Sequence, residues 1–288
     1  MLLNNIAVTS DLIIYSDGAK TESDKVIIKE IRTYLKAISG FKTITIHESC
    51  KNKGLANSII EGVTDVINRH GKVIVLEDDL IVSQNFLAFM NKALDFYELN
   101  NKVFSVSGYG LKVALPKNYE YDVYFTHRGL SWGWATWKDR WDNVDWDVKD
   151  FEQLKEDKLV KKKFAQGGTD LFPMLKKQME NNLDSWAIRW FYSQFKNNLF
   201  TVFPTISKVK NVGFDADATH TNVYNRYKIV FDSSNQQEFI FDNCVVINPI
   251  VLLSFQRYYS IFTRIFFGRL ITPFIRLKQI LKKTSVSC

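Results

Sequence analysis

The sequence predicts an α/β protein with a mostly parallel sheet flanked by helices, and two observations support this fold class. Over the first hundred residues, short β-branched runs alternate with segments of helical periodicity, an order typical of parallel strands joined by crossover helices. The run KVIVL at 72–76 is apolar after its first residue, as expected of a strand covered on both faces. The length of 288 residues and the 46% hydrophobic content suit one large domain and exclude a disordered chain.

The expected elements follow from local signals along the chain. Helices are expected where apolar side chains recur at helical spacing, one capped by Ser23, one ended by Gly71 and one capped by Ser83. Beyond residue 103 the alternation loosens, and all seven tryptophans fall between Trp132 and Trp190. We expect strands at 11–16, 43–47 and 72–76 and in VFSVS and YDVYFT, and helices at 23–40, 54–70, 83–97, 151–163 and 185–196.

The formal net charge of +7 is concentrated at the C-terminal end. Residues 1–242 contain 31 basic and 31 acidic residues, whereas 243–288 contain seven basic residues and no acidic residue. A neutral body gives no electrostatic reason to expect nucleic-acid binding. We therefore divide the chain into a domain at 1–242 and a basic, aromatic, amphipathic helical tail at 243–288.

The tail combines apolar aromatic runs with spaced arginines. Arg257 and Arg264 are seven residues apart and so share a helical face, and no charge-free run reaches the roughly 20 residues that span a bilayer. This pattern fits a helix lying on an anionic membrane surface. The alternative is a C-terminal helix packed on the body with its basic residues outward. Three cysteines without a CxxC pair fit a reducing compartment, and the N-terminus has no signal-peptide pattern.

Three adjacent carboxylates, Glu77, Asp78 and Asp79, follow the strand predicted at 72–76. In open α/β sheets ligands bind beyond the carboxyl ends of the strands, so these side chains are expected to face a cleft. Packed carboxylates repel one another unless a cation or protons neutralise them, and oxygen-only ligands favour Mg²⁺ or Mn²⁺. A solvated acidic loop before the helix capped by Ser83 is the alternative interpretation.

Five segments occur in an order that points to a known family: YSDG, NKGLANSI, VIVLEDDL, GLSWGWATWKDRW and PTISKVKNVGFDADATH. Together they resemble bacterial glycosyltransferases of the GT-A type, and among these the group related to N-acetylglucosaminyltransferase I. The resemblance covers most of 12–220 and implies a GT-A-like (Rossmann-like) sheet. It implies an inverting, metal-dependent transferase that moves a sugar from a nucleotide-sugar donor, a UDP-sugar, to a glycan or lipid-linked acceptor. The implied setting is bacterial surface-polysaccharide synthesis in the cytoplasm, peripheral on the inner membrane face.

The resemblance also assigns roles to the acidic residues, because the triplet matches a variant of the DxD motif. Asp79 would hold the divalent metal, Mn²⁺ or Mg²⁺, Asp78 would contact the ribose, and Glu77 would contact the donor sugar. Asp17, which ends an early strand, matches the position that reads the uracil. Breaking a sugar–phosphate bond requires charge neutralisation on the departing diphosphate, which a bound divalent cation supplies.

An inverting transferase also needs a general base for the acceptor hydroxyl. Asp184 in NNLDSWAIRW matches the family's base, which stands at the start of a helix in this region. Its alternative role is the N-cap of the helix that begins near Trp186. Lys53, in the loop before the helix at 54–70, is a candidate contact to the diphosphate, and its alternative is an exposed lysine in the polar run KNK.

Three further residues are candidates for the donor site. His220, which closes GFDADATH, matches a region near the diphosphate or the metal, although a lone histidine is more often structural. Trp132 and Trp134 flank Gly133 and are expected to line the cleft, because glycine permits close approach and aromatic faces cover apolar sugar surfaces. Most of the other tryptophans are expected in the core.

One departure from the family pattern concerns the N-terminus. The family begins with an additional strand and helix, and only ten residues precede Asp11 here, so the nucleotide-base pocket is expected to be incomplete. The alternative function is therefore a non-catalytic or truncated protein of this fold that acts as a membrane-docked partner of an active transferase. A nucleotidyltransferase would be expected to carry a glycine-rich, basic phosphate loop near its start, and the sequence has none.

Overall fold

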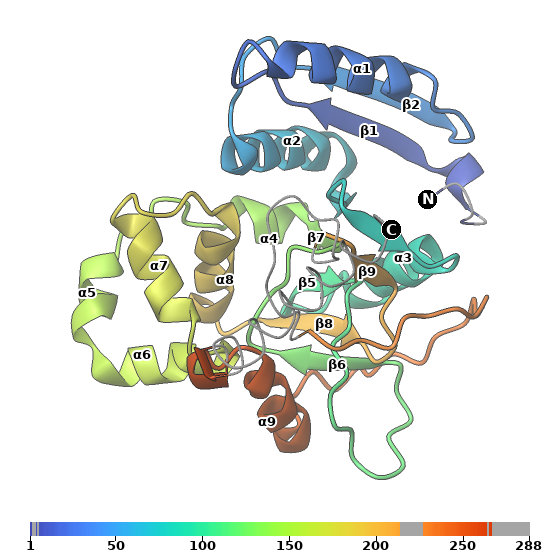
Figure 1. The fold of residues 1–288 in the computed structure, drawn as a ribbon. Helices are drawn as coiled ribbons and strands as arrows, with labels where there is room; N and C mark the ends of the chain where they lie inside the picture. Colours follow the sequence, from blue (N-terminus) through green and yellow to red (C-terminus); the bar gives the residue numbers. More distant parts are fainter. Residues whose placement is uncertain (2–3, 5, 214–226, 264, 267–288) are drawn as a thin grey trace, which may run out of the picture.

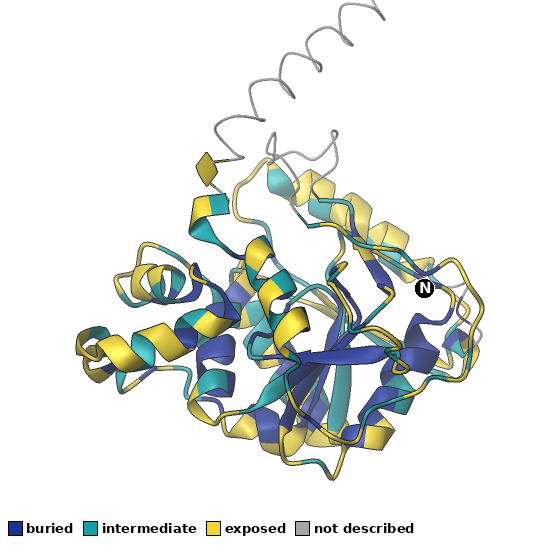
Figure 2. Ribbon diagram, turned by 90° about the horizontal axis from the view of Figure 1, so that it is seen from below, coloured by how far each residue is buried: buried dark blue, intermediate teal, exposed yellow. Residues whose placement is uncertain are grey.

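The computed structural model describes residues 1, 4, 6–213, 227–263 and 265–266. They form a mixed α/β fold in which helices surround a central five-stranded sheet (Figure 1), so the predicted α/β class is confirmed. The strands of this sheet lie in the buried middle of the molecule (Figure 2). Apolar clusters pack on both faces, because the neighbouring residues Trp134 and Ala135 of one strand belong to different clusters.

The central sheet has the strand order β3-β7-β5-β8-β6 and is mixed. β5 and β8 are parallel, whereas β7 is antiparallel to β3 and β5, and β6 is antiparallel to β8. The predicted mostly parallel sheet is therefore not confirmed. No helix separates β5, β6 and β7 within 103–137, all of which is described, so the crossover rule that makes strands parallel does not apply to them. The strands are β3 (Lys72–Val75), β5 (Val103–Ser107), β6 (Val123–Thr126), β7 (Trp134–Trp137) and β8 (Phe200–Pro204).

The N-terminal strands form a separate parallel pair. β1 (Asp11–Ser16) and β2 (Thr43–Glu48) are joined by helix α1 (Asp24–Lys36), and these elements match the prediction to within a few residues. Ser23 is the N-cap residue of α1, as predicted, but its side chain makes no capping hydrogen bond. Instead, the Asp24 carboxylate accepts a hydrogen bond from Thr21 N.

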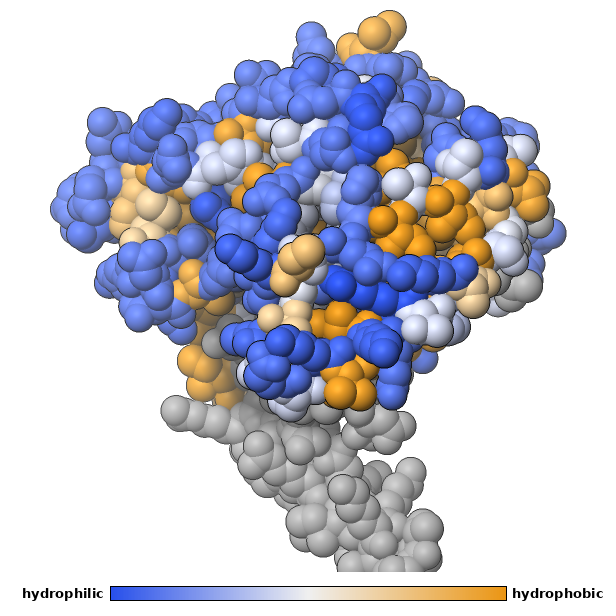
Figure 3. Space-filling view, turned by 90° about the horizontal axis from the view of Figure 1, so that it is seen from above, coloured by the Kyte–Doolittle hydropathy of each residue, from blue (hydrophilic) through white to orange (hydrophobic). Residues whose placement is uncertain are grey.

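Helix α1 is the least covered helix of the N-terminal part. None of its residues is buried, and Ile27 and Ile31 are 57% and 47% exposed. Figure 3 views the molecule from above, the side on which α1 lies in Figure 1, and shows a mostly hydrophilic face with a few hydrophobic groups. Helix α2 (Leu55–His70) lies beneath β1 and connects this unit to the rest of the molecule (Figure 1). It ends at Gly71 in a left-handed conformation, as predicted.

A short antiparallel pair borders the end of β3. β4 (Leu80–Val82) pairs with β9 (Val209–Asn211) and leads into α3 (Phe86–Tyr97). Asn85, two residues later than the predicted cap, precedes α3, and Ser83 donates a hydrogen bond to the Asn85 side chain at 2.7 Å. The importance of this pair for the site is that it brings a distant part of the chain beside the residues that follow β3.

Five helices form a second layer beside the sheet (Figure 1). Their core is aromatic: the rings of Trp134, Trp141, Trp186 and Trp190 contact one another, with Trp134 and Trp190 only 4.4 Å apart between centroids. Most tryptophans are therefore core residues, as expected. The helices are α4 (Lys138–Asp142), α5 (Phe151–Glu156), α6 (Lys158–Phe164), α7 (Leu171–Met179) and α8 (Trp186–Lys196), and short 3₁₀ turns are η1 (Ala7–Thr9) and η2 (Ala165–Gly167).

The first part of the predicted tail packs on the body. Helix α9 (Pro249–Tyr258) buries Val251 and Phe255 in the same cluster as the central sheet. Over the part of the chain that the structure covers, no helix is both long and apolar enough to cross a bilayer. Residues 267–288, the rest of the tail, lie outside the described residues.

Candidate functional site

The acidic triplet lies directly after β3, where the chain turns into β4. Asp78 is exposed, whereas Glu77 and Asp79 are half-buried. The Asp79 carbonyl accepts a hydrogen bond of 3.0 Å from Val212 N, just beyond β9. The β4–β9 pair therefore holds 211–213 against Asp79, which residue spacing along the chain could not reveal.

The Asp79 carboxylate is fixed in place but incompletely satisfied. Among the described residues, its buried Oδ1 has no hydrogen-bond partner. Burial raises the pKa of this carboxyl, as does the charge of Asp78, while a hydrogen bond from Asn211 opposes the shift. Gly213 packs so closely that an added Cβ would lie 2.4 Å from Asp79 Oδ2. One oxygen of a well-positioned carboxylate is thus left for a ligand.

Glu77 shares this environment. Burial, followed by the charges of Asp79 and Asp78, raises its pKa to about 7. None of the three carboxylates forms an ion pair with a described residue. Within the described residues no Lys or Arg offsets their mutual repulsion, which protons or a bound cation would relieve.

The chemistry of this cluster suits a hard divalent cation. Its oxygens are the ligands that Mg²⁺ and Mn²⁺ favour, and the buried Asp79 Oδ1 has no partner among the described residues. Within the described chain, no group of three or more His, Cys, Asp or Glu side chains converges to enclose a metal. Such an enclosure is not required, because Mg²⁺ is commonly bound through one or two carboxylates, waters and substrate phosphates. Asp79 would be the primary protein ligand.

Asp17 is held by a different part of the fold, at the N-terminus of α2. Its carboxylate accepts hydrogen bonds from Gly18 N at 2.8 Å, Lys53 N at 2.9 Å and Gly54 N at 3.1 Å. An added Cβ at Gly18 would lie 2.4 Å from the backbone of Lys51, which explains the glycine in the YSDG segment. Asp17 therefore joins the end of β1 to the loop that precedes α2.

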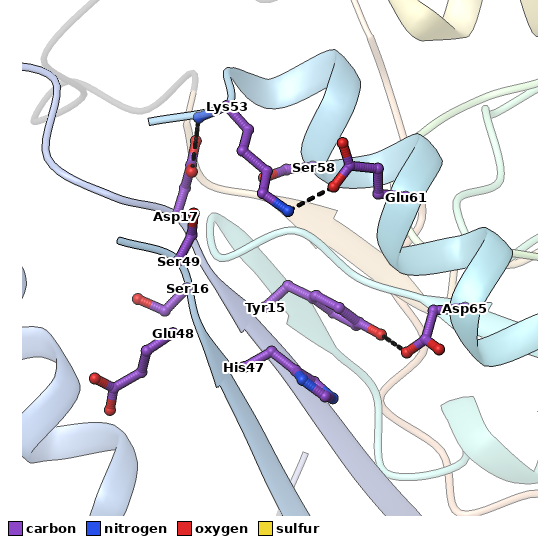
Figure 4. A pocket seen from close by; sticks show the side chains of 10 residues that line it. All are labelled: Tyr15, Ser16, Asp17, His47, Glu48, Ser49, Lys53, Ser58, Glu61 and Asp65. Carbon is purple, nitrogen blue, oxygen red and sulfur yellow. Dashed lines mark hydrogen bonds and ion pairs between the residues drawn. The ribbon is translucent and has the colours of Figure 1, made fainter. Parts of the chain in front are cut away.

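A cavity of about 280 Å³ opens beside this loop, between the ends of β1 and β2 and one face of α2 (Figure 4). Two of the predicted site residues, Asp17 and Lys53, line it. The Lys53 ammonium forms an ion pair with Glu61 at 2.5 Å, which raises the pKa of the lysine. Lys53 is thus a partly exposed, paired lysine, and a diphosphate would have to compete with Glu61 for it.

The floor of the cavity is aromatic and was not predicted. The rings of Tyr15 and His47 stack with centroids 4.8 Å apart and planes 15° apart, because the parallel register places these residues opposite each other. The Tyr15 hydroxyl donates to Asp65 at 2.5 Å; burial and this bond raise its pKa to about 12. Gly62 makes room for the ring, since a Cβ there would lie 3.1 Å from it. Stacked rings beside carboxylates suit a neutral polar ring better than an anion.

Asp184 lies close to the same loop. An added Cβ at Gly54 would be 3.7 Å from Asp184 Oδ2, so the exposed Asp184 side chain stands over the N-terminus of α2. Its alternative role as a helix cap is wrong, because Ser185 is the N-cap of α8 and accepts the bond from Ile188 N. The Asp184 charge also acts on Arg189, partly opposing the burial that lowers the pKa of this guanidinium.

The two tryptophans expected in the cleft differ in environment. Trp132 is half-buried and meets the rings of Tyr109 and Tyr227 edge-on, at 5.0 and 5.1 Å. Trp134 is 1% exposed and belongs to the aromatic core, so its placement in the cleft was wrong. Gly133 does permit a close approach, but to the core: its added Cβ would lie 2.7 Å from Val209.

The predicted residues therefore fall into two groups. Asp17, Lys53 and Asp184 gather at the N-terminus of α2, and the triplet Glu77–Asp79 lies beyond β3, beside Asn211, which was not predicted. No hydrogen bond or ion pair between described residues joins the two groups. His220 lies outside the described residues. Of the residues that the sequence did not indicate, Tyr15 could have been found by its place in the predicted strand at 11–16, two residues before Asp17.

No protein-family model matches this chain, and a search of curated proteins finds none that is similar. The resemblance to GT-A glycosyltransferases thus stays a prediction from the five sequence segments.

Proposed function

We propose that this protein is a metal-dependent glycosyltransferase of the GT-A type, which transfers a sugar from a nucleotide-sugar donor, a UDP-sugar, to a glycan or lipid-linked acceptor. The observation that carries the proposal is Asp79. Among the described residues, its buried Oδ1 has no hydrogen-bond partner, and no ion pair compensates the three carboxylates that follow the central strand β3. The ordered resemblance of 12–220 to the GT-A pattern supports the same conclusion.

In this proposal the chain's own residues bind and orient the donor. Asp79 would hold Mn²⁺ or Mg²⁺, which when bound supplies charge neutralisation for the leaving diphosphate. Asp78 is exposed and would accept a hydrogen bond from the ribose. Glu77 would contact the donor sugar. With a pKa of about 7, Glu77 can donate or accept a hydrogen bond near neutral pH.

The cavity beside α2 is the proposed nucleobase site. Tyr15 and His47 provide stacked rings, and the surrounding carboxylates accept hydrogen bonds. Asp17 is saturated by backbone N–H groups, so we assign it to shaping the loop rather than to reading uracil directly. Half-buried Trp132 is the better placed of the two tryptophans to contact a sugar ring.

Asp184 is the proposed general base. It would accept the proton of the acceptor hydroxyl as that oxygen bonds to the anomeric carbon of the donor. The bond from this carbon to the diphosphate oxygen breaks at the same time, and its electron pair leaves with the nucleoside diphosphate. Direct displacement of this kind inverts the anomeric centre. An exposed carboxylate that does not cap its helix is free to take part in it.

The proposed setting is bacterial surface-polysaccharide synthesis, with the protein peripheral on the inner membrane face through its basic tail. The composition of 243–288, with seven basic residues and no acidic residue, supports an anionic membrane surface as one partner.

One observation favours a second candidate, a non-catalytic protein of this fold that docks at the membrane and assists an active transferase. The Asp17 carboxylate is used internally, and Lys53 is paired with Glu61. Two of the residues expected to contact the donor are thus engaged within the protein.

A thermal-shift titration with UDP, GDP, CDP and dTDP, each with and without Mn²⁺, tests the proposal. A ligand that binds only the folded state raises the melting temperature. At a free ligand concentration of a hundred times Kd, the free energy of unfolding increases by about 2.7 kcal/mol. We expect a manganese-dependent shift with UDP that Asp79→Ala abolishes. Folded protein that shifts with no nucleotide would overturn the catalytic proposal in favour of the second candidate.

A further inference from the structure

Helix α9 is apolar on two sides, and only one of them is covered. Val251 and Phe255 on the inner side are 1% and 0% exposed. On the outer side Ile250 and Leu253 are 49% and 62% exposed. A helix that packs on a domain normally turns polar residues outward, so this outer side needs a separate explanation.

Two more exposed apolar side chains follow the end of the helix in the sequence. Phe262 and Phe266 are 75% and 49% exposed and stack on each other at 5.8 Å. We refer to the side chains of Ile250, Leu253, Phe262 and Phe266 as the C-terminal apolar surface.

The C-terminal apolar surface is held on a rigid support. Tyr259, between its two halves, is 1% exposed, and its ring lies 3.7 Å from the Arg128 guanidinium, which is paired with Asp170 at 2.7 Å. Ile261 N donates to Thr169 Oγ1 at 3.0 Å. These contacts of Tyr259 and Ile261 attach the chain between Leu253 and Phe262 to the body of the protein.

Basic residues surround this surface on both sides. On one side the loop at 112–117 carries two exposed lysines, Lys112 and Lys117, and no acidic residue. The Tyr258 hydroxyl donates to the Lys112 carbonyl at 2.6 Å, and Ala114 N donates to Ser254 at 2.8 Å. This loop therefore runs along α9, as Figure 1 shows at the lower edge of the molecule.

On the other side stands the end of α6. Gln256 donates to the carbonyl of Gln166 at 2.9 Å, two residues beyond the last residue of α6. That end of the helix carries the exposed Lys162 and Lys163, which form no ion pair with any described residue. Figure 2, which views the molecule from below, shows α9 and α6 on the same side with many exposed residues.

We propose that the C-terminal apolar surface, with Lys112, Lys117, Arg257, Lys162 and Lys163 around it, docks on an anionic lipid surface. The apolar side chains would enter the headgroup region while the lysines and Arg257 contact lipid phosphates. This proposal rests on the proposed function, which places membrane contact on the basic tail, and adds a second membrane-binding surface on the body of the protein. It fixes which side of the molecule faces the bilayer.

Sedimentation of the full chain with two kinds of vesicle tests the proposal. Vesicles of phosphatidylcholine and phosphatidylglycerol in equal parts should bind the protein, and vesicles of phosphatidylcholine alone should not. The double variant Leu253→Ser, Phe262→Ser should lose affinity by about tenfold or more. Lys162→Ala, Lys163→Ala should lose roughly thirtyfold, at about 1 kcal/mol for each lysine. Leu99→Ser, at a site 93% exposed elsewhere, is the matched control and should bind as the parent does.

Three results would overturn the proposal. The first is binding of both double variants with parental affinity, which would assign any membrane contact to the tail alone. The second is no binding by the parent. The third is a parent dimer that Leu253→Ser, Phe262→Ser dissociates without vesicle binding, measured by light scattering, which would make this surface a contact with a second copy. Asp79→Ala should bind vesicles normally, so failure of the transferase proposal and failure of this one are distinguishable.

Discussion

The Asp17 carboxylate accepts a hydrogen bond from Gly54 N at 3.1 Å, and this contact joins the end of β1 to the beginning of α2. The same carboxylate also binds Gly18 N and Lys53 N. One side chain thus organises the loop that borders both the aromatic cavity and Asp184. We therefore assign Asp17 to holding this loop in position and not to the chemical reaction.

Replacement of this carboxylate should therefore affect stability. Asp17→Ala leaves three backbone N–H groups without their acceptor, and we expect the free energy of unfolding to fall by about 1–3 kcal/mol. Urea denaturation would measure the change, with the exposed Glu22→Ala as the control. If Asp17→Ala kept parental stability but lost the UDP-dependent thermal shift, Asp17 would be a ligand contact and not a loop anchor.

Removal of charge from the acidic triplet should have the opposite effect on stability. Burial and the charges of neighbouring carboxylates raise the pKa values of Glu77 and Asp79. Asp79→Asn removes one of these charges, so the metal-free protein should become more stable by about 0.5–1 kcal/mol. The manganese-dependent thermal shift should vanish in the same variant. Glu120→Gln, an exposed acid away from the triplet, should change neither quantity. A destabilised Asp79→Asn that still responds to manganese would contradict the metal assignment.

The elements that sequence predicted well are those set by neighbouring residues. The β-branched run at 11–16 and the glycine at 71 act within a few residues of themselves, and β1 and the end of α2 follow. Ser23 occupies the N-cap position of α1 without a side-chain capping bond, and the Ser83 hydroxyl bonds to the Asn85 side chain instead of capping α3. Such local competition is not decided by residue type.

The relationships that sequence did not predict involve distant partners. Insertion of β7 between β3 and β5 depends on tertiary packing, and it carries Trp134 into the core. Asn211 and Gly213 reach Asp79 through the β4–β9 pair, for which the sequence has no signal. The acidic triplet itself was predictable, because it follows an apolar strand at a known kind of binding edge. Its unpartnered oxygen was not.

Low pH should decrease the stability of the protein through a buried ion pair at Lys208, the residue before β9. Lys208 is paired with Asp232, both side chains are 3% exposed, and Asn85 donates to the same carboxylate at 3.0 Å. Although burial opposes the shift, these partners lower the pKa of Asp232 to about 2. Because the folded pKa lies below the unfolded value of about 3.9, the contribution is complete above about pH 4 and is lost as pH falls toward 2.

The variant Asp232→Asn isolates this contribution. It leaves the Lys208 ammonium buried without a counter-ion, and stability at pH 7 should fall by about 3 kcal/mol. The difference in melting temperature between parent and variant should narrow as pH drops from 4 to 2. A constant difference over that range would show that the carboxylate does not titrate there.

Asp184 allows the sharpest separation of chemistry from binding. Its side chain is exposed and its helix is capped by Ser185, so Asp184→Asn should leave the melting temperature and the UDP-dependent shift unchanged. Loss of the general base should nevertheless lower kcat by about a hundredfold or more, measured as nucleoside diphosphate released with an acceptor present. Glu180→Gln, at an exposed acid that follows the last residue of α7, should keep parental turnover. Equal turnover by Asp184→Asn and the parent would remove Asp184 from the mechanism, and a donor shift lost together with activity would make it a donor-binding residue instead.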